Sequence, residues 1–446
     1  MILGDLIVPS GDRIRRLRKI LGLKQEEITD GKITRNLISY IENGKTRLMP
    51  DTAKIIADCI NIKAREQGKD MFITSEYLLE DEVTQADRLL GDLIEALQRY
   101  DDNKDRMFLE ELRKAEKLLD KYDIPYRRVK IYELASEWYY NKGQIHDSYL
   151  YNMKLFENSM WENDLYRRLS VIIKLAKCAL RLNNYNEAII LNNYALSISN
   201  NNEHLYVDII KKALFNNALA YKKLSQYDMC LVEIAKLELK FDNLSKNEKF
   251  DVDILKGNCY LNKNEYSIAL EIYGGLLEDI VEFNDTEKLI AVYNNIAAVY
   301  YVKEEYNKSL EYRHKCYELS REIESINSKY ILFQVAQNYE KLNKFDLAEK
   351  NLLVTKKMCS RIGDIALLID ANRLLSRVYM QTSRELSLKK IVEEMVGFIG
   401  EVHTLTSNDA LKIERLFFEV ALHFIYKDTN YSRSIMKLGL KIQENI

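Results

Sequence analysis

The first sixty residues carry apolar side chains at helical spacing, grouped into short segments. Ile14, Leu17 and Leu21 fall at i, i+3 and i+7, which predicts a helix over residues 10–20. Three more short helices are expected to begin near Lys24, Thr34 and Pro50. Glycine accepts the left-handed geometry that ends a helix, so Gly44 is expected to end the third one. The segment therefore predicts a small four-helix domain.

Further along, the pattern repeats about every 40 residues. In five places an aromatic residue follows a polar turn: Tyr185, Tyr227, Tyr266, Tyr306 and Phe345. A small residue occurs three positions after most of these aromatics, and another nine positions before, because two helices pack closely only where small residues meet. We predict five helical hairpins over residues 167–360 and one weaker hairpin on each side, in which Ile145 and Glu385 occupy the position of the aromatic. A frayed pair is expected near residues 416–426.

Composition agrees with a helical protein of several parts. The 446 residues are 47% hydrophobic and 30% charged, with only 15 Gly and 3 Pro, and so few turn residues argue against a β-rich fold. The chain is too long for one ordinary core. Its net charge of −2 excludes a general polyanion binder. Residues 1–62 nevertheless carry eleven basic and eight acidic side chains, which indicates a basic N-terminal head on an acidic body.

Several kinds of chemistry find no support in the sequence. Six cysteines are spread singly, which favours a reducing cytoplasm: Cys59, Cys178, Cys230, Cys259, Cys316 and Cys359. We recognise no leader segment and no membrane span. The five histidines show no metal-ligand spacing, and Gly44-Lys45-Thr46 lacks the earlier glycine of a nucleotide loop, because that position is Ser39. We expect a cytoplasmic protein that is not an enzyme and uses no metal or cofactor.

The N-terminal segment resembles the Cro/C1-type (XRE) helix-turn-helix over residues 10–62. The resemblance rests on Arg13-Ile14-Arg15, on Leu23-Lys24-Gln25-Glu26-Glu27-Ile28 and on Ile38-Ser39-Tyr40-Ile41-Glu42-Asn43-Gly44. It departs at Thr29, where that family usually has alanine, and in a slightly longer turn between the second and third helices.

This resemblance implies that the third helix enters the major groove of double-stranded DNA. Base contacts are expected from the start and outer face of that helix: Thr34, Arg35, Asn36, Ser39 and Tyr40. An arginine donates two bonds to guanine and an asparagine pairs with adenine, which are the roles expected of Arg35 and Asn36. Phosphate contacts are expected from Gln25, Lys45 and Arg47. The alternative is that all eight are solvated polar residues of a small helical domain.

The hairpins resemble tetratricopeptide repeats (TPRs) lengthened to about 40 residues, whose first helices line a concave groove. Groove positions, counted from the small residue of each first helix, are Lys174, Lys177, Asn216, Asn258, Asn294, Asn295, Gln334 and Gln337, with Tyr301 and Phe333 nearby. A carboxamide both donates and accepts hydrogen bonds, so this row suits the backbone of an extended peptide. Lys174 and Lys177 suit its C-terminal carboxylate. The alternative is that they are ordinary solvated helix residues.

The combined architecture resembles the RRNPP family of peptide-pheromone receptors. It predicts an all-α fold, with a helix-turn-helix domain at residues 1–66, a linker or connecting helix at 67–80 on which the head could swing, and a right-handed TPR-like α-solenoid at 81–446. The resemblance implies a homodimeric transcription regulator that binds operator DNA and a short signalling peptide. The other hypothesis is a scaffold that binds a partner protein, with the head acting as a peptide-independent repressor.

Overall fold

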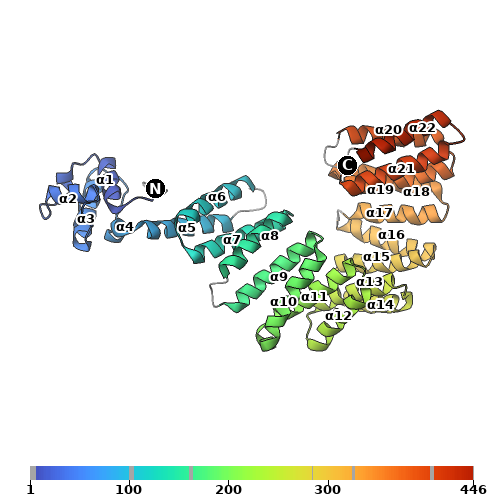
Figure 1. Cartoon of the computed structure of the whole chain (residues 1–446), viewed down its shortest axis with the longest axis horizontal. Coiled ribbons are helices and arrows are strands. Elements are labelled where there is room, and N and C mark those ends of the chain that lie inside the picture. Colours follow the sequence, from blue (N-terminus) through green and yellow to red (C-terminus); the bar gives the residue numbers. More distant parts are fainter. Residues whose placement is uncertain are drawn as a thin grey trace. The chain divides into compact units, whose positions relative to one another are not determined.

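The computed structural model describes residues 7–99, 105–159, 164–283, 285–323, 327–401 and 406–444. Every regular element within these ranges is a helix (Figure 1), so the all-α prediction is confirmed. The chain divides into two compact units, Met1–Ala220 and Tyr221–Ile446. In the described part of the chain, no helix is both long and apolar enough to cross a membrane.

The first unit begins with the four predicted helices. They are α1 (Ser10–Ile20), the one-turn 3-10 helix η1 (Gln25–Ile28), α2 (Arg35–Glu42) and α3 (Pro50–Glu66). Thr34 caps α2, because its hydroxyl oxygen accepts the backbone N–H of Leu37 at 3.3 Å. Asp30 and Gly31 both have positive φ, which lets the chain turn between η1 and α2.

The head's core continues past residue 66. The short helix α4 (Ser75–Leu79) places Leu78 in the same buried cluster as Ile14 and Ile56. The Asn61 side chain pairs with the backbone of Ile73 in both directions, each bond being 2.7 Å. Residues 71–79 therefore pack on the head, and α4 lies within the segment predicted as a linker or connecting helix.

Nine pairs of consecutive helices follow, and within each unit the two helices of a pair pack against each other as a hairpin (Figure 1). Those of the first unit are α5 (Glu82–Gln98), α6 (Asp105–Lys121), α7 (Pro125–Asn141), α8 (Ile145–Ser159), α9 (Leu165–Arg181) and α10 (Tyr185–Ser199), then the 3-10 turn η2 (Asn200–Leu205). The next pair of consecutive helices is α11 (Val207–Lys223) and α12 (Tyr227–Lys240).

The remaining hairpins belong to the second unit. They are α13 (Lys246–Asn262) with α14 (Tyr266–Phe283), α15 (Thr286–Val302) with α16 (Tyr306–Glu322), α17 (Ser328–Lys341) with α18 (Phe345–Ile362), α19 (Ile365–Gln381) with α20 (Glu385–Glu401), and α21 (Ser407–Phe424) with α22 (Thr429–Glu444). The predicted positions of the five central and two flanking hairpins are confirmed. The last pair is full-length and not frayed, because Phe417 and Phe424 are buried in its core.

One turn recurs inside seven of the hairpins. Its left-handed residue lies two positions before the second helix: Gly143, Asn183, Ser225, Asn264, Glu304, Asn343 and Ser383. The next amide then bonds to a carbonyl five residues back, as Glu265 does to Tyr260 at 2.9 Å. The recurring aromatic is the first residue of the second helix, and the Tyr266 hydroxyl donates to the Asn264 side chain at 2.8 Å.

Small residues lie where the two helices of a hairpin cross, as predicted. Ser309 of α16 donates its hydroxyl to the carbonyl of Ala297 in α15 at 2.7 Å. Gly257 of α13 has no room for a side chain, because an added Cβ would lie 2.5 Å from Cε1 of the buried Tyr273. Close helix contact thus explains these positions.

Candidate functional sites

The surface of α2 and the loop after it carries most of the predicted DNA-contact residues. Thr34, Arg35, Asn36, Tyr40, Lys45 and Arg47 are exposed, and Ser39 is half-buried. Arg35 forms an ion pair with Glu26 of η1 at 3.2 Å, and both side chains are about two-thirds exposed. An ion pair this open to water is worth at most about 1 kcal/mol, so Arg35 can leave it for another acceptor at little cost.

Gln25 plays a structural part that the sequence did not reveal. Its side-chain amide donates to the carboxylate of Glu42 at 2.9 Å. Glu42 is buried and also accepts from Arg18 of α1. Burial alone would raise the pKa of the Glu42 carboxyl, but the hydrogen bonds from Arg18 and Gln25 outweigh it and lower that pKa. The carboxylate thus joins α1, η1 and α2.

Two buried polar side chains fasten the head to the helices after it. The Arg13 guanidinium donates to the carbonyls of Tyr77 and Glu80, the latter at 2.9 Å, and lies 4.9 Å from the Tyr77 ring centroid. Gln85 of α5 exchanges hydrogen bonds with the backbone of Val8, at 3.1 and 3.0 Å. The segment between the head and the first hairpin is therefore tightly bonded.

In the first unit, Lys174 and Lys177 share a cavity of about 320 Å³ between α7, α8 and α9. Lys174 pairs with Glu137 at 3.0 Å, and the Lys177 ammonium lies 4.5 Å from the Tyr140 ring centroid. Asn152 lines the same cavity, and its Oδ1 is buried without a hydrogen-bond partner. The cavity thus combines the two predicted cations with a carboxamide and an aromatic ring that the repeat pattern did not single out.

Asn216, also predicted to face the groove, is nearly buried, with 9% of its surface exposed. The side chain of its neighbour Asn217 forms two hydrogen bonds with other asparagine side chains. It accepts from Asn192 at 3.0 Å and donates to Asn193 at 2.9 Å. These bonds join α10 to α11 inside the first unit.

In the second unit, the predicted carboxamides fall into two groups. Three are held by neighbouring side chains: Asn258 accepts the Tyr273 hydroxyl at 3.0 Å, and the oxygens of Asn294 and Gln334 both accept from Arg313. The others are half-buried, and the side chains of Asn295 and Gln337 form no hydrogen bond within the described residues. Tyr301 and Phe333 are half-buried as well.

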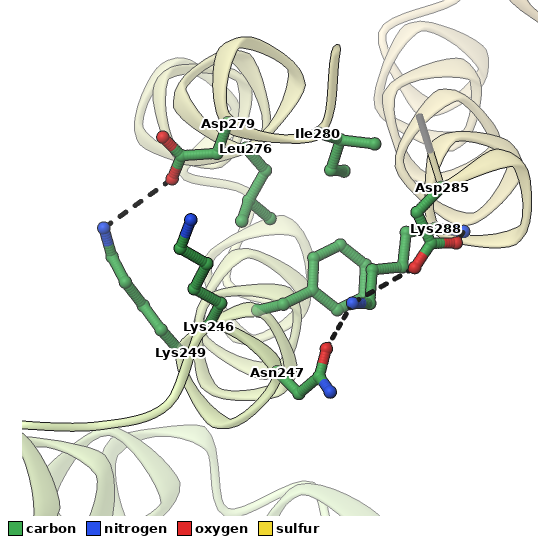
Figure 2. A pocket seen from close by; sticks show the side chains of 9 residues that line it. Lys246, Asn247, Lys249, Leu276, Asp279, Ile280, Asp285 and Lys288 are labelled. Atoms are coloured by element: carbon green, nitrogen blue, oxygen red, sulfur yellow. Dashed lines mark hydrogen bonds and ion pairs between the residues drawn. The ribbon is translucent and has the colours of Figure 1, made fainter. Parts of the chain in front are cut away.

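A further cavity of about 430 Å³ lies among α13, α14 and α15, and none of the predicted site residues lines it. Figure 2 shows Lys249 reaching toward Asp279, at 3.7 Å, and Lys288 between Asn247 and Asp285, at 3.2 Å from the latter. Leu276 and Ile280 give it an apolar side.

The cysteines include one close pair that the sequence did not indicate. Cys230 of α12 and Cys259 of α13 lie with their sulfurs 3.1 Å apart, both fully buried. Among the described residues, no group of histidine, cysteine and acidic side chains is arranged to hold a metal ion.

Comparison with known proteins shows that the head is a helix-turn-helix domain. The helix-turn-helix family matches residues 14–67, which contain α2 and α3. No curated protein matches the chain in sequence. The chain is a helix-turn-helix domain followed by TPR-like helical hairpins.

Solved structures share the helical-repeat fold at low identity. A signal transduction ATPase with numerous domains (STAND) protein with a tetratricopeptide repeat sensor, from Pyrococcus horikoshii, is 15% identical with a TM-score of 0.53, and covers 98% of this chain. This chain spans only 63% of that protein. At this identity the likeness concerns the fold alone.

Two further solved structures come from Bacillus thuringiensis. The apo form of the quorum sensor NprR is 15% identical with a TM-score of 0.47, covering 95% of this chain and 99% of that one. PlcR, solved in complex with the peptide PapR7 and DNA, is also 15% identical, with a TM-score of 0.31 and coverage of 79% and 95%.

Proposed function

We propose that this protein is a cytoplasmic transcription regulator that binds operator DNA through its head and a short signalling peptide along its hairpins. The observation that carries the DNA part is the exposed face of α2 in a helix-turn-helix domain. Arg35 and Asn36 stand on the first turn of α2, the part of a recognition helix that meets base edges. Lys45 and Arg47 follow α2, where they can neutralise phosphates.

The peptide part rests on half-buried polar side chains along the first helices of the hairpins. Asn295 and Gln337 keep their donors and acceptors available, since no described residue bonds to them. Such groups suit the N–H and C=O groups of an extended peptide. In the first unit, Lys174 and Lys177 add positive charge to a separate cavity, which suits an acidic group.

The hydrogen bonds between the head and the helices after it offer a way for peptide binding to affect DNA binding. Arg13 and Gln85 tie the head to α4 and α5, so a change in the first hairpins moves the head instead of being lost in a loose linker. Peptide alters DNA binding only if it binds one arrangement of the hairpins better than another. We also propose a homodimer, because paired heads read two half-sites of an operator.

The test is binding of the purified full-length protein to its own upstream DNA, with and without short synthetic peptides from the adjacent reading frame. Specific binding that changes with peptide is expected. Specific binding that no peptide alters would leave a plain repressor whose hairpins bind a partner protein. Absence of specific DNA binding would favour the scaffold hypothesis.

A further inference from the structure

Arg313 of α16 is a buried cation in the middle of the second unit. Only 5% of its surface is exposed. Its Nη1 group donates to the side-chain oxygens of Asn294 in α15 and Gln334 in α17, whereas its Nε–H group is buried without an acceptor. The guanidinium is thus held between two first helices by neutral groups.

The fold itself does not require a charge at this position. Arg313 lies seven residues after the start of its helix. In the other six second helices that follow the recurring turn, the equivalent residues are Asn152, Asn192, Ile234, Tyr273, Leu352 and Val392. All six are buried and uncharged. Burying an unpaired cation is unfavourable, and apolar residues of similar size usually serve at least as well. A role other than packing accounts for arginine here.

No described carboxylate forms an ion pair with Arg313. Burial lowers the pKa of its guanidinium to about 10, so the side chain keeps its charge at neutral pH. Burial and the nearby Glu340 raise the pKa of the Tyr301 hydroxyl, and Arg377 of α19 and Arg313 oppose that rise, so both guanidinium groups lie near Tyr301. The Nε–H group of Arg377 is likewise buried without a partner. Two under-partnered guanidinium groups therefore lie beside the predicted groove residue Tyr301.

We propose that Arg313 anchors a carboxylate of the bound peptide, which supplies the ion-pair partner that no described residue provides. This inference rests on the proposed peptide-binding function. Asn294 and Gln334 orient the guanidinium plane, and the carboxylate accepts from Nη2, which donates to no described residue. Arginine and carboxylate match in geometry, so the contact selects for an acidic group and not for bulk alone.

The site would reject peptides without such a group. A neutral ligand leaves the buried charge unpaired, and hydrogen bonds between charged groups are worth enough to change affinity by about tenfold to a hundredfold. Two peptide groups offer this chemistry, the C-terminal carboxylate and the side chain of an aspartate or glutamate.

The test uses full-length protein and two synthetic hexapeptide libraries, identical except that one ends in a free carboxylate and the other in an amide. Captured peptides are identified by mass spectrometry, and the affinities of the strongest are measured by calorimetry. We expect enrichment of free-acid peptides if the terminal carboxylate is the ligand group. Enrichment of peptides with an internal acidic residue in both libraries would assign the side chain.

Arg313→Leu is the test variant, since Leu352 occupies the equivalent position elsewhere. Arg321→Gln, an exposed arginine on the same helix, is the control. We expect Arg313→Leu to weaken binding of the selected peptides at least about tenfold and to leave the unfolding temperature of the free protein unchanged or higher.

Three results would overturn the inference. Equal affinity of Arg313→Leu and the native protein for the selected peptides would remove Arg313 from the site while leaving peptide binding intact. A marked loss of stability in the free variant would make the guanidinium a structural element. Capture of no peptide by the native protein would refute the proposed peptide function, and the anchor with it.

Discussion

Glu42 accepts two hydrogen bonds from the guanidinium of Arg18, at 2.7 Å from Nε and 3.0 Å from Nη2. The two residues lie on different helices, α2 and α1, and the carboxylate is buried. Arg15 donates as well, to the Glu42 backbone carbonyl. The orientation of α2 therefore depends on one buried carboxylate.

Glu42→Ala is expected to lower the free energy of unfolding of the head by about 3 kcal/mol, because it leaves the partly buried Arg18 and the Gln25 amide without their acceptor. Hydrogen exchange of the full-length protein, followed in peptides from residues 10–42, measures the change. Glu66→Ala is the control, because the Glu66 pair with Lys63 is solvent-exposed and should contribute less than about 1 kcal/mol. Equal exchange in the two variants would contradict the structural role of Glu42.

The same carboxylate predicts a pH dependence. The folded-state pKa of Glu42 lies below its usual value of 4.5, so its contribution is complete above that value and is lost as the pH falls through the folded-state pKa. We expect protection of residues 10–42 to fall on acidification below about pH 4.5. Glu42→Gln cannot ionise and should show a shallower fall. An identical pH profile in the variant would assign the acid sensitivity to other groups.

Arg35→Ala is expected to weaken specific operator binding by about 1–3 kcal/mol, through loss of two bonds to a guanine. Fluorescence anisotropy with the operator and a scrambled duplex separates base contact from general attraction. Lys54→Ala, which removes an exposed cation from α3, is the control. If both variants lose affinity equally for both duplexes, Arg35 contributes charge alone and reads no base.

Asn295→Ala is expected to leave DNA binding without peptide intact and to weaken the peptide response by about 1 kcal/mol, the worth of an ordinary hydrogen bond. The response is measured as the peptide concentration that produces half of the maximal change in operator binding. Asn307→Ala, on the exposed side of α16, should not change that concentration. An unaltered response in Asn295→Ala would take this carboxamide out of the site.

Substituting alanine for two glycines of the same hairpin should change the free energy of unfolding in opposite directions. Gly257→Ala places a methyl group against Tyr273 and is expected to lower the free energy of unfolding by about 1–3 kcal/mol. Gly274→Ala meets no atom within 4 Å and should raise it by about 0.5–1 kcal/mol, since alanine is the better helix former. Urea unfolding measures both. Addition of Tyr273→Leu should rescue Gly257→Ala, and failure of that rescue would point to a different cause.

Sequence pattern was sufficient to predict the helices and most hairpins, because their signals are local. The aromatic at the start of a second helix and the left-handed residue before it act within a few positions, as Asn264 and Tyr266 illustrate. The hairpin of α5 and α6 was not predicted, since its second helix begins with Asp105 and not with an aromatic residue. Its core instead joins Leu90, Phe108 and Leu112 across the two helices.

The candidate sites could be predicted only in part. Surface positions such as Arg35 follow from a helix's place in its domain. The partners of Glu42 and Arg313 depend on which helices meet in space, and their separations in the chain, up to 24 and 21 residues, carry no periodic signal. Comparing the residue seven positions after the start of each second helix that follows the recurring turn would have revealed Arg313 as the charged exception.

The recurring turn affects how the number of hairpins in this chain can evolve. Each turn satisfies its backbone groups with its own hairpin, as the bond from Glu265 to Tyr260 does. Duplicating or deleting a whole hairpin leaves no turn with a broken bond, whereas removing ten residues would break one. The array is therefore expected to lengthen or shorten in complete steps, so that ligand length and the number of hairpins can evolve together.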